Sequence, residues 1–395
     1  MNTKAKIVEI DSDYLVNSLL ELLSIPSPTG LTDEIVHFVS GKLTDLKLTH
    51  ELTRRGAIRC SLSSDATKDI FGRAIVTHLD TLGAMVKELK SNGRLRLLPV
   101  GTWSSRFAEG TRGTLFTDKG SLRGTILPLM ASGHTYNEKV DTQPVSWSNI
   151  EFRIDEWSKS KEELTELGVQ VGDFIAIDSQ PEIIENGFIN ARFLDDKAGV
   201  ACVLTALKAI MEHKLEVPVP TFPLFTISEE VGSGASSILQ GSISEMVSVD
   251  IAIAGPEQES VENALTIVHM DSSGPFDYHL SKKLKNICHS SGLNYKTDVF
   301  EHYRSDSAAA VEAGNDIRTA LVGFGTDASH GCERTHLDSL KAVTQLLIQY
   351  AISPSTFPRD KNPLGPIKGF PHQIDKDDLP KPDQQLPDPA ELLDK

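Results

Sequence analysis

The sequence predicts an α/β protein built on a doubly wound mixed sheet with helices on both faces, interrupted by a small β-rich domain. Apolar runs of strand length alternate with helical segments, as in "GRAIVTHLD", "FPLFTIS", "VDIAIAG" and "RTALVGF". Such short runs, apolar throughout, are typical of parallel strands that are buried on both faces. After the first run, the texture changes to frequent glycines separated by short β-rich pieces, which indicates an insertion.

Four segments have apolar residues at helical spacing. Leucines recur behind a serine or aspartate cap in residues 12–24, and "IPSPTG" separates this helix from a second one in residues 31–46. The clearest helix is "DDKAGVACVLTALKAIMEHK", residues 195–214, and the last one lies near residues 339–353. We therefore expect helices to frame the chain and to separate its strands.

The domain boundaries follow from the change in texture. Residues 90–186 are predicted to form a small antiparallel barrel or sandwich. Residues 1–89 and 187–352 would then form one discontinuous catalytic domain. Residues 353–395 are rich in proline and poor in apolar clusters, so we expect an extended or partly ordered tail.

Composition narrows the function classes. The chain has 395 residues, with 39 Lys and Arg against 55 Asp and Glu, which gives a formal charge of −16. This balance argues against a nucleic-acid partner or an anionic membrane surface. The four cysteines are scattered with no CxxC pair, as expected for reduced thiols, and no stretch reaches 18 apolar residues. We expect a cytoplasmic protein without a signal peptide.

Polar side chains follow the predicted strands at the end where open α/β sheets build their sites. They are His78 and Asp80, Glu229 and Glu230, Glu257, and His330 and His336, with Asp195 and Asp196 just before a helix. Imidazoles mixed with several carboxylates are typical of a hydrolytic zinc, cobalt or manganese site.

Each of these motifs also has a structural explanation. His78 and Asp80 could be an exposed strand end, and the paired aspartates could cap a helix. Glu229 and Glu230 could lie in a solvated turn, although the apolar run before them disfavours this. If they serve chemistry, one glutamate can bind metal while its neighbour takes a proton from water.

Charge counting supports two metal ions. Two divalent ions bring four positive charges, while Asp195, Glu230, Glu257 and one bridging hydroxide bring four negative charges. The set would be neutral in a cleft of low dielectric.

Four blocks in this order resemble the glutamyl and deblocking aminopeptidase family of dinuclear metallopeptidases, which includes the tetrahedral (TET) aminopeptidases. They are "THLDTLGAMV", "INARFLDDKAGVACVL", "TISEEVGSGAS" and "RSDSAAAVEAGNDIRTALVGFGTDASH". "RGTILPLMASGH" and "SKSKEELTELGVQVGDFIAID" resemble the inserted β-domain of that family, which implies that residues 90–186 serve oligomerisation or substrate access. The resemblance covers roughly residues 14–350.

The resemblance implies two divalent ions, zinc or cobalt or manganese, with a water bridging them that attacks the carbonyl of an amide bond. One ion would bind His78, Asp195 and an acidic residue that ends the strand in the 250s, and the other would bind Asp195, Glu230 and His330. Glu229 would be the general base, and Asp80 would orient His78.

The sequence departs from the family pattern in two places. Where an aspartate ligand is usual, this chain has "GPE", and we expect the longer Glu257 to reach the ion. Asp250 is placed at the start of the same strand, ~13 Å or more away at ~3.3 Å per residue, and is therefore a poor substitute. In "SHGCERTH" we prefer His330 as the ligand, with His336 as the alternative, while His134 in the insert is expected to be structural or to face the rim.

The function that these features predict is an aminopeptidase that acts on short peptides within a homo-oligomer, from dimer to dodecamer. One alternative keeps the site but makes the substrate an N-acetylated glutamine dipeptide osmolyte, a specialisation linked to a subgroup of the family. Another is a binding or scaffold protein that lacks a full dinuclear site because the third ligand is lost.

Overall fold

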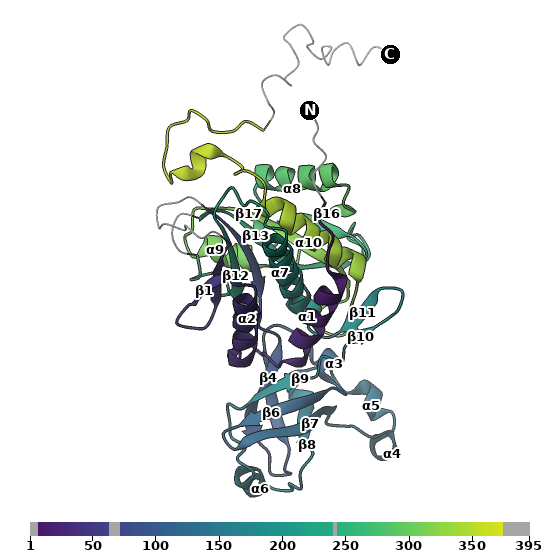
Figure 1. Ribbon diagram of the computed structural model, residues 1–395. Helices are drawn as coiled ribbons and strands as arrows, with labels where there is room; N and C mark the ends of the chain where they lie inside the picture. The colour runs from purple at the N-terminus through teal and green to yellow at the C-terminus, as the bar shows by residue number, and fades with distance from the viewer. Residues whose placement is uncertain (1–6, 63–71, 240–242, 374–395) are drawn as a thin grey trace, which may run out of the picture.

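The computed structural model describes residues 7–62, 72–239 and 243–373, and it contains an α/β domain and a closed β-barrel (Figure 1). The helices of the α/β domain are α1 (Ser12–Ser24), α2 (Asp33–Asp45), α7 (Leu194–Glu212), α8 (Tyr278–Ser291), α9 (Asp306–Glu312) and α10 (Leu337–Ala351). Its strands are β1 (Thr49–Leu52), β2 (Ile58–Ser61), β3 (Gly72–His78), β10 (Glu182–Ile183), β11 (Phe188–Ala191), β12 (Thr221–Thr226), β13 (Ile243–Ala254), β14 (Leu265–Asp271), β15 (Gly274–Pro275), β16 (Tyr295–Val299), β17 (Arg318–Asp327) and β18 (Glu333–His336).

The strands form one mixed sheet in the order β1-β2-β12-β3-β13-β17-β18-β11-β10. Strand β14 also pairs with β17, and β15 and β16 each pair with β14. Its centre is parallel, because β3 lies between β12 and β13, and β13 pairs with β17 in the same direction. Every residue of β3 and β12 is buried, as the apolar runs predicted. The predicted fold class is thus confirmed.

Helices cover the sheet with the apolar faces that their spacing predicted. Helix α7 packs against β3 and β13 and contacts both α1 and α10, while α9 packs against β13 and β17. Almost every residue of α7 is buried, which suits a helix enclosed between the sheet and two other helices. Its first residues therefore occupy a fixed position at the edge of the sheet.

The inserted domain is a closed six-stranded barrel in the order β4-β5-β8-β7-β6-β9, and it forms a separate lobe below the α/β domain in Figure 1. The strands are β4 (Gly83–Leu89), β5 (Leu95–Val100), β6 (Arg112–Thr117), β7 (Gly120–Pro128), β8 (Ile150–Ile154) and β9 (Phe174–Ile177), with short helices α3 (Ser105–Ala108), α4 (Gly133–Tyr136), α5 (Lys139–Thr142) and α6 (Lys161–Glu166).

The barrel lies a few residues earlier in the chain than the segment 90–186 that the sequence suggests. Strand β4 belongs to the barrel, because it pairs with β5 and β9. The sequence did not reveal this, since only a short connection separates His78 from Gly83 and no turn signal marks the change of domain. At the other end, β10 pairs with β11 and so belongs to the main sheet. The barrel strands therefore span residues 83–177.

All four cysteines are free thiols, as predicted, and Cys332 alone among them is exposed. Within the described residues, no helix is both long and apolar enough to cross a membrane.

Of the predicted tail, residues 353–373 are described, and residues 374–395 lie outside the described residues. Arg73 on β3 donates hydrogen bonds to the carbonyl oxygens of Ser353 (3.0 Å) and Pro354 (2.9 Å). These bonds hold the first part of the tail against the sheet.

We predict that Phe152→Ala lowers the free energy of unfolding of the barrel by about 3–5 kcal/mol, because Phe152 fills the barrel core and its removal leaves a cavity. Urea unfolding followed by tryptophan fluorescence measures this directly, since Trp103, Trp147 and Trp157 all lie in the barrel segment. The exposed Leu98 on β5 is the matched control, and Leu98→Ala should stay within about 0.5 kcal/mol. Equal losses for the two variants would contradict this core assignment.

Candidate active site

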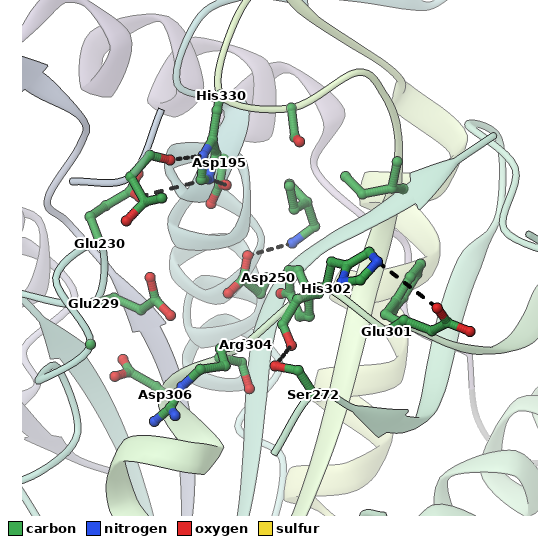
Figure 2. A pocket seen from close by; sticks show the side chains of 18 of the residues that line it. Asp195, Glu229, Glu230, Asp250, Ser272, Glu301, His302, Arg304, Asp306 and His330 are labelled. Atoms are coloured by element: carbon green, nitrogen blue, oxygen red, sulfur yellow. Dashed lines mark hydrogen bonds and ion pairs between the residues drawn. The ribbon is translucent and has the colours of Figure 1, made fainter. Parts of the chain in front are cut away.

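A cleft of 1220 Å³ opens where β3 and β12 end and α7 begins, and Figure 2 shows the side chains that line it. Acidic groups dominate its floor, with Asp195, Glu229, Glu230, Asp250 and Asp306 all facing the same space. Strands β12 and β13 and the first turns of α7 and α9 bring these groups to one edge of the sheet, as expected for an open α/β fold.

Asp195 lies at the centre of the cluster. His78 Nε2 is 3.1 Å from Asp195 Oδ1, and His330 Nε2 is 3.6 Å from Asp195 Oδ2. Burial would raise the pKa of Asp195, but its contacts with His330 and His78 lower it below the ordinary value. Its two oxygens thus face two different histidines.

Two groups of side chains could each hold a metal ion, and they share Asp195. The first contains His78, Asp195 and Asp250, and the second contains Asp195, Glu230 and His330. In each group the donor atoms lie within 4.8 Å of one another, which leaves room for an ion bound at ~2.0–2.2 Å. Four of the five expected ligands are therefore brought together.

The placement of Glu257 and Asp250 corrects the sequence analysis. Glu257 lines the cleft, but it is exposed and belongs to neither group. Strand β13 begins at Ile243 rather than at Asp250, and Ser248 pairs with Val76 of β3. Two residues further along these parallel strands, Asp250 lies level with His78 and takes the place expected for Glu257.

Asp80 contacts His78 differently from the expectation. His78 Nδ1 is 2.9 Å from the backbone oxygen of Asp80, whereas the nearer carboxylate oxygen is 3.7 Å away. The Asp80 carboxylate instead accepts hydrogen bonds from the amides of Glu229 (3.1 Å) and Glu230 (3.3 Å) and from the Thr29 hydroxyl (2.6 Å). Asp80 therefore holds both the imidazole and the turn that carries the two glutamates.

Glu229 and Glu230 are not equivalent. Glu230 Oε2 lies 3.8 Å from His330 Nε2 within the second group, while Glu229 Oε2 lies 4.0 Å from His78 Nε2 and belongs to neither group. Burial raises the pKa of both carboxyl groups well above the usual range, and for Glu230 the charge of Asp195 adds to this.

His330 is held from both domains. Its Nδ1 lies 2.8 Å from the backbone oxygen of Thr102 in the barrel segment, so Nε2 is left to face the acidic cluster. Its amide donates to Glu333 Oε1 (2.9 Å), and the amide of Asp195 donates to Glu333 Oε2 (3.1 Å). Burial, together with the charge of Asp195, raises the pKa of Glu333 to about 8.

Glu333 was not anticipated from the sequence, and neither was the role of Thr102. The spacing of residues in "HGCERTH" does not distinguish this glutamate from a surface residue. Its two carboxylate oxygens gain their role only in the folded chain, where the backbone amides of Asp195 and His330 lie beside them. The two other histidines that the sequence analysis considered lie outside the cluster. His336 contacts the Asn186 backbone oxygen (2.9 Å) and caps α10, and His134 is exposed on α4.

The donor set fits divalent metal ions. Three carboxylates and two imidazoles are the mixed ligands that zinc, cobalt and manganese accept. Burial and the charge of Asp195 also raise the pKa of Asp250 well above its ordinary value, so the cluster holds more buried negative charge than its two histidines balance. Divalent cations would offset the charge of these carboxylates.

Comparison with known proteins places the chain in an aminopeptidase family. The sequence profile described as M42 glutamyl aminopeptidase matches residues 56–346, well over half of the chain, and the chain belongs to this family. The predicted resemblance is thereby confirmed.

A relative agrees with this family assignment, and solved structures agree with the fold. A Bacillus subtilis protein named "Putative aminopeptidase YhfE" is 37% identical over 335 residues, covering 85% of this chain and 96% of that protein. A TET aminopeptidase from a marine sediment archaeon of the Thaumarchaeota has a TM-score of 0.77 at 18% identity, covering 85% of this chain and 96% of its own. The Pyrococcus horikoshii TET1 peptidase, described as assembling into a tetrahedron or a large octahedral shell, has a TM-score of 0.77 at 22% identity and covers 86% and 100%.

We predict that Glu333→Gln lowers the rate of hydrolysis of an aminoacyl substrate by ~10–100-fold, because an amide oxygen cannot accept from the amides of both Asp195 and His330 in the way two carboxylate oxygens do. Steady-state assays with a chromogenic aminoacyl amide provide the measurement. Glu262→Gln makes the same chemical change in an ion pair with Arg334 (2.7 Å) outside the cleft and should stay near the wild-type rate. A fully active Glu333→Gln protein would show that Glu333 does not support the site.

Proposed function

We propose that this protein is a dinuclear metal-dependent aminopeptidase that hydrolyses amide bonds in short peptides. The observation that carries the proposal is the pair of donor groups that share the buried Asp195 on the floor of a 1220 Å³ cleft. Membership of the aminopeptidase family supports the reaction type.

His78, Asp195 and Asp250 would hold one ion, and Asp195, Glu230 and His330 would hold the other. When bound, the two ions, zinc or cobalt or manganese, would supply Lewis acidity and lower the pKa of a water that they share. Asp250 takes the role for which the sequence favoured Glu257.

Glu229 is the general base in this proposal. It faces the cleft beside His78 and is not part of either donor group, so its carboxylate is free to exchange protons. Glu229 accepts a proton from the attacking water as the water oxygen bonds to the amide carbon. It returns that proton to the nitrogen as the carbon–nitrogen bond breaks, and the new amino terminus leaves.

The supporting residues fix this geometry through backbone hydrogen bonds. The Asp80 carboxylate accepts from the amides of both glutamates, so the base and the ligand keep different positions although they are neighbours in sequence. Glu333 does the same for Asp195 and His330. Precise positioning of this kind accounts for a large share of catalytic power.

The scaffold alternative depends on a missing third ligand, and the grouping of Asp250 with His78 and Asp195 argues against it. A panel of aminoacyl, N-acetylated and γ-linked dipeptides separates the remaining possibilities. The proposal expects hydrolysis of substrates with a free α-amino group. Activity on N-acetylated dipeptides alone would replace it with the osmolyte alternative.

We further propose that the chain works as a cytoplasmic homo-oligomer. Apolar side chains are exposed on the barrel segment, with Trp157 89% exposed and Val145, Leu98 and Phe107 between 41% and 44%. Exposed apolar groups of this kind favour burial against another chain. The solved relatives described as shells or dodecamers agree with this proposal.

We predict that Glu229→Gln keeps two bound ions but lowers kcat by ~10²–10⁴-fold, because the amide is isosteric but cannot take a proton. Metal content of the purified variant and its kcat are measured side by side. Glu301→Gln is a matched control, since Glu301 lines the same cleft and is largely exposed. Undiminished turnover in Glu229→Gln would assign the base to another residue.

We predict that Asp250→Asn binds one divalent ion tightly instead of two, whereas Glu257→Gln still binds two. The loss of a charged ligand weakens only the group that contains it. Isothermal titration of each apoprotein with Zn²⁺ or Co²⁺ gives the stoichiometry. The reverse pattern would restore Glu257 as the ligand.

A further inference from the structure

The loop between β16 and α9 forms one wall of the cleft. Its residues Glu301, His302 and Arg304, labelled in Figure 2, line the cleft on that side. Tyr303 lies in the middle of this loop and also lines the cleft. Its backbone oxygen accepts hydrogen bonds from the amide (3.0 Å) and the hydroxyl (2.8 Å) of Ser272.

The ring of Tyr303 is fixed by apolar contacts. It lies 5.5 Å from the ring of Phe300, centroid to centroid, and packs with Ala252, Ile253 and Phe300 in a small buried cluster. Ala252 and Ile253 follow Asp250 closely on β13, so the side chain of Tyr303 lies against the strand that carries this proposed ligand. A phenylalanine would pack equally well there, and only the hydroxyl group distinguishes tyrosine.

That hydroxyl group is buried and has no hydrogen-bond partner in the structure as it stands. A buried polar group without a partner costs about 1–3 kcal/mol. Asp250 precedes Ala252 by two residues on β13, so the two side chains lie on the same face of the strand, and both Asp250 and Tyr303 line the cleft. The charge of Asp250 also raises the pKa of Tyr303, after the larger effect of burial. Because the hydroxyl oxygen is shielded from solvent, a substrate does not reach it, and its partner must come from the protein.

Asp250 has an oxygen available for this contact. Oδ1 accepts from the backbone amide of Ile251 at 2.7 Å, which ties one side of the carboxylate to its own strand. The two histidine ligands are each held by a backbone oxygen: His78 by that of the nearby Asp80, and His330 by that of the distant Thr102. A phenol hydroxyl from the loop that packs against β13 would hold Asp250 in a comparable manner.

We propose that Tyr303 is a positioning residue: its hydroxyl donates a hydrogen bond to the carboxylate of Asp250 and fixes the orientation of that carboxylate toward His78 and Asp195. The inference rests on the proposed function, since it assigns Asp250 to a metal ion. Outer partners of this kind orient ligands and strengthen metal binding.

The test is titration of metal-free protein with Co²⁺, followed by calorimetry and by the visible absorption of the bound ion. Tyr303→Phe removes only the hydroxyl. Tyr350→Phe is the matched control, because Tyr350 is a fully buried tyrosine outside the cleft whose hydroxyl donates to Glu245 (3.1 Å). Thermal unfolding of the metal-free variants checks that both are folded.

We expect Tyr303→Phe to bind one of the two ions ~10–100-fold more weakly and to change its absorption spectrum, while Tyr350→Phe binds both ions as the wild type does. In an Asp250→Asn background, Tyr303→Phe should have no further effect on affinity, because the partner of the hydroxyl has changed. An effect of Tyr303→Phe that persists at full size in that background would overturn the inference.

The two proposals fail in different ways. If Asp250→Asn binds both ions as tightly as the wild type, Asp250 is not a ligand, and the assignment under the proposed function falls together with this one. If Asp250→Asn loses one ion but Tyr303→Phe binds both with wild-type affinity and spectrum, only the role of Tyr303 is wrong.

Discussion

The sharing of Asp195 between two histidines is the interaction on which the rest of the site depends. Its oxygens face His78, from the end of a parallel strand, and His330, from a turn far along the chain. A buried carboxylate can join two donor groups in this way only if it is held at a fixed place, and the start of α7, enclosed between sheet and helices, provides that place. The barrel participates as well, because Thr102 orients His330.

Around this centre, the chain uses carboxylates for two different purposes. Asp195, Glu230 and Asp250 point into the cleft, where they accumulate negative charge that the protein alone does not balance. Asp80 and Glu333 point away and accept backbone amides, and each of them ties together two segments of the site. In the proposed function the first kind would bind the cations, and the second kind holds the geometry of the residues that bind them. Both kinds are buried, so neither tolerates loss of its partners cheaply.

Much of this could be predicted from the sequence, for physical reasons that also explain the failures. Apolar runs that end in polar residues reveal strands and their carboxyl ends, which is why His78, Glu230 and His330 could be placed together. The choice between Asp250 and Glu257 required the register of β13 against β3, and register depends on long-range pairing that one chain segment does not display. The domain boundary at β4 failed similarly, because nothing local marks where the sheet ends and the barrel begins.

The central claim is that two divalent ions share Asp195. Anomalous X-ray diffraction from crystals of zinc-loaded protein, recorded at the zinc absorption edge, tests it most directly. The account predicts two peaks, each within ~2.0–2.2 Å of a different oxygen of Asp195, with Asp250 beside one peak and Glu230 beside the other. A single peak, or a second peak beside Glu257 with Asp250 left unligated, would contradict it.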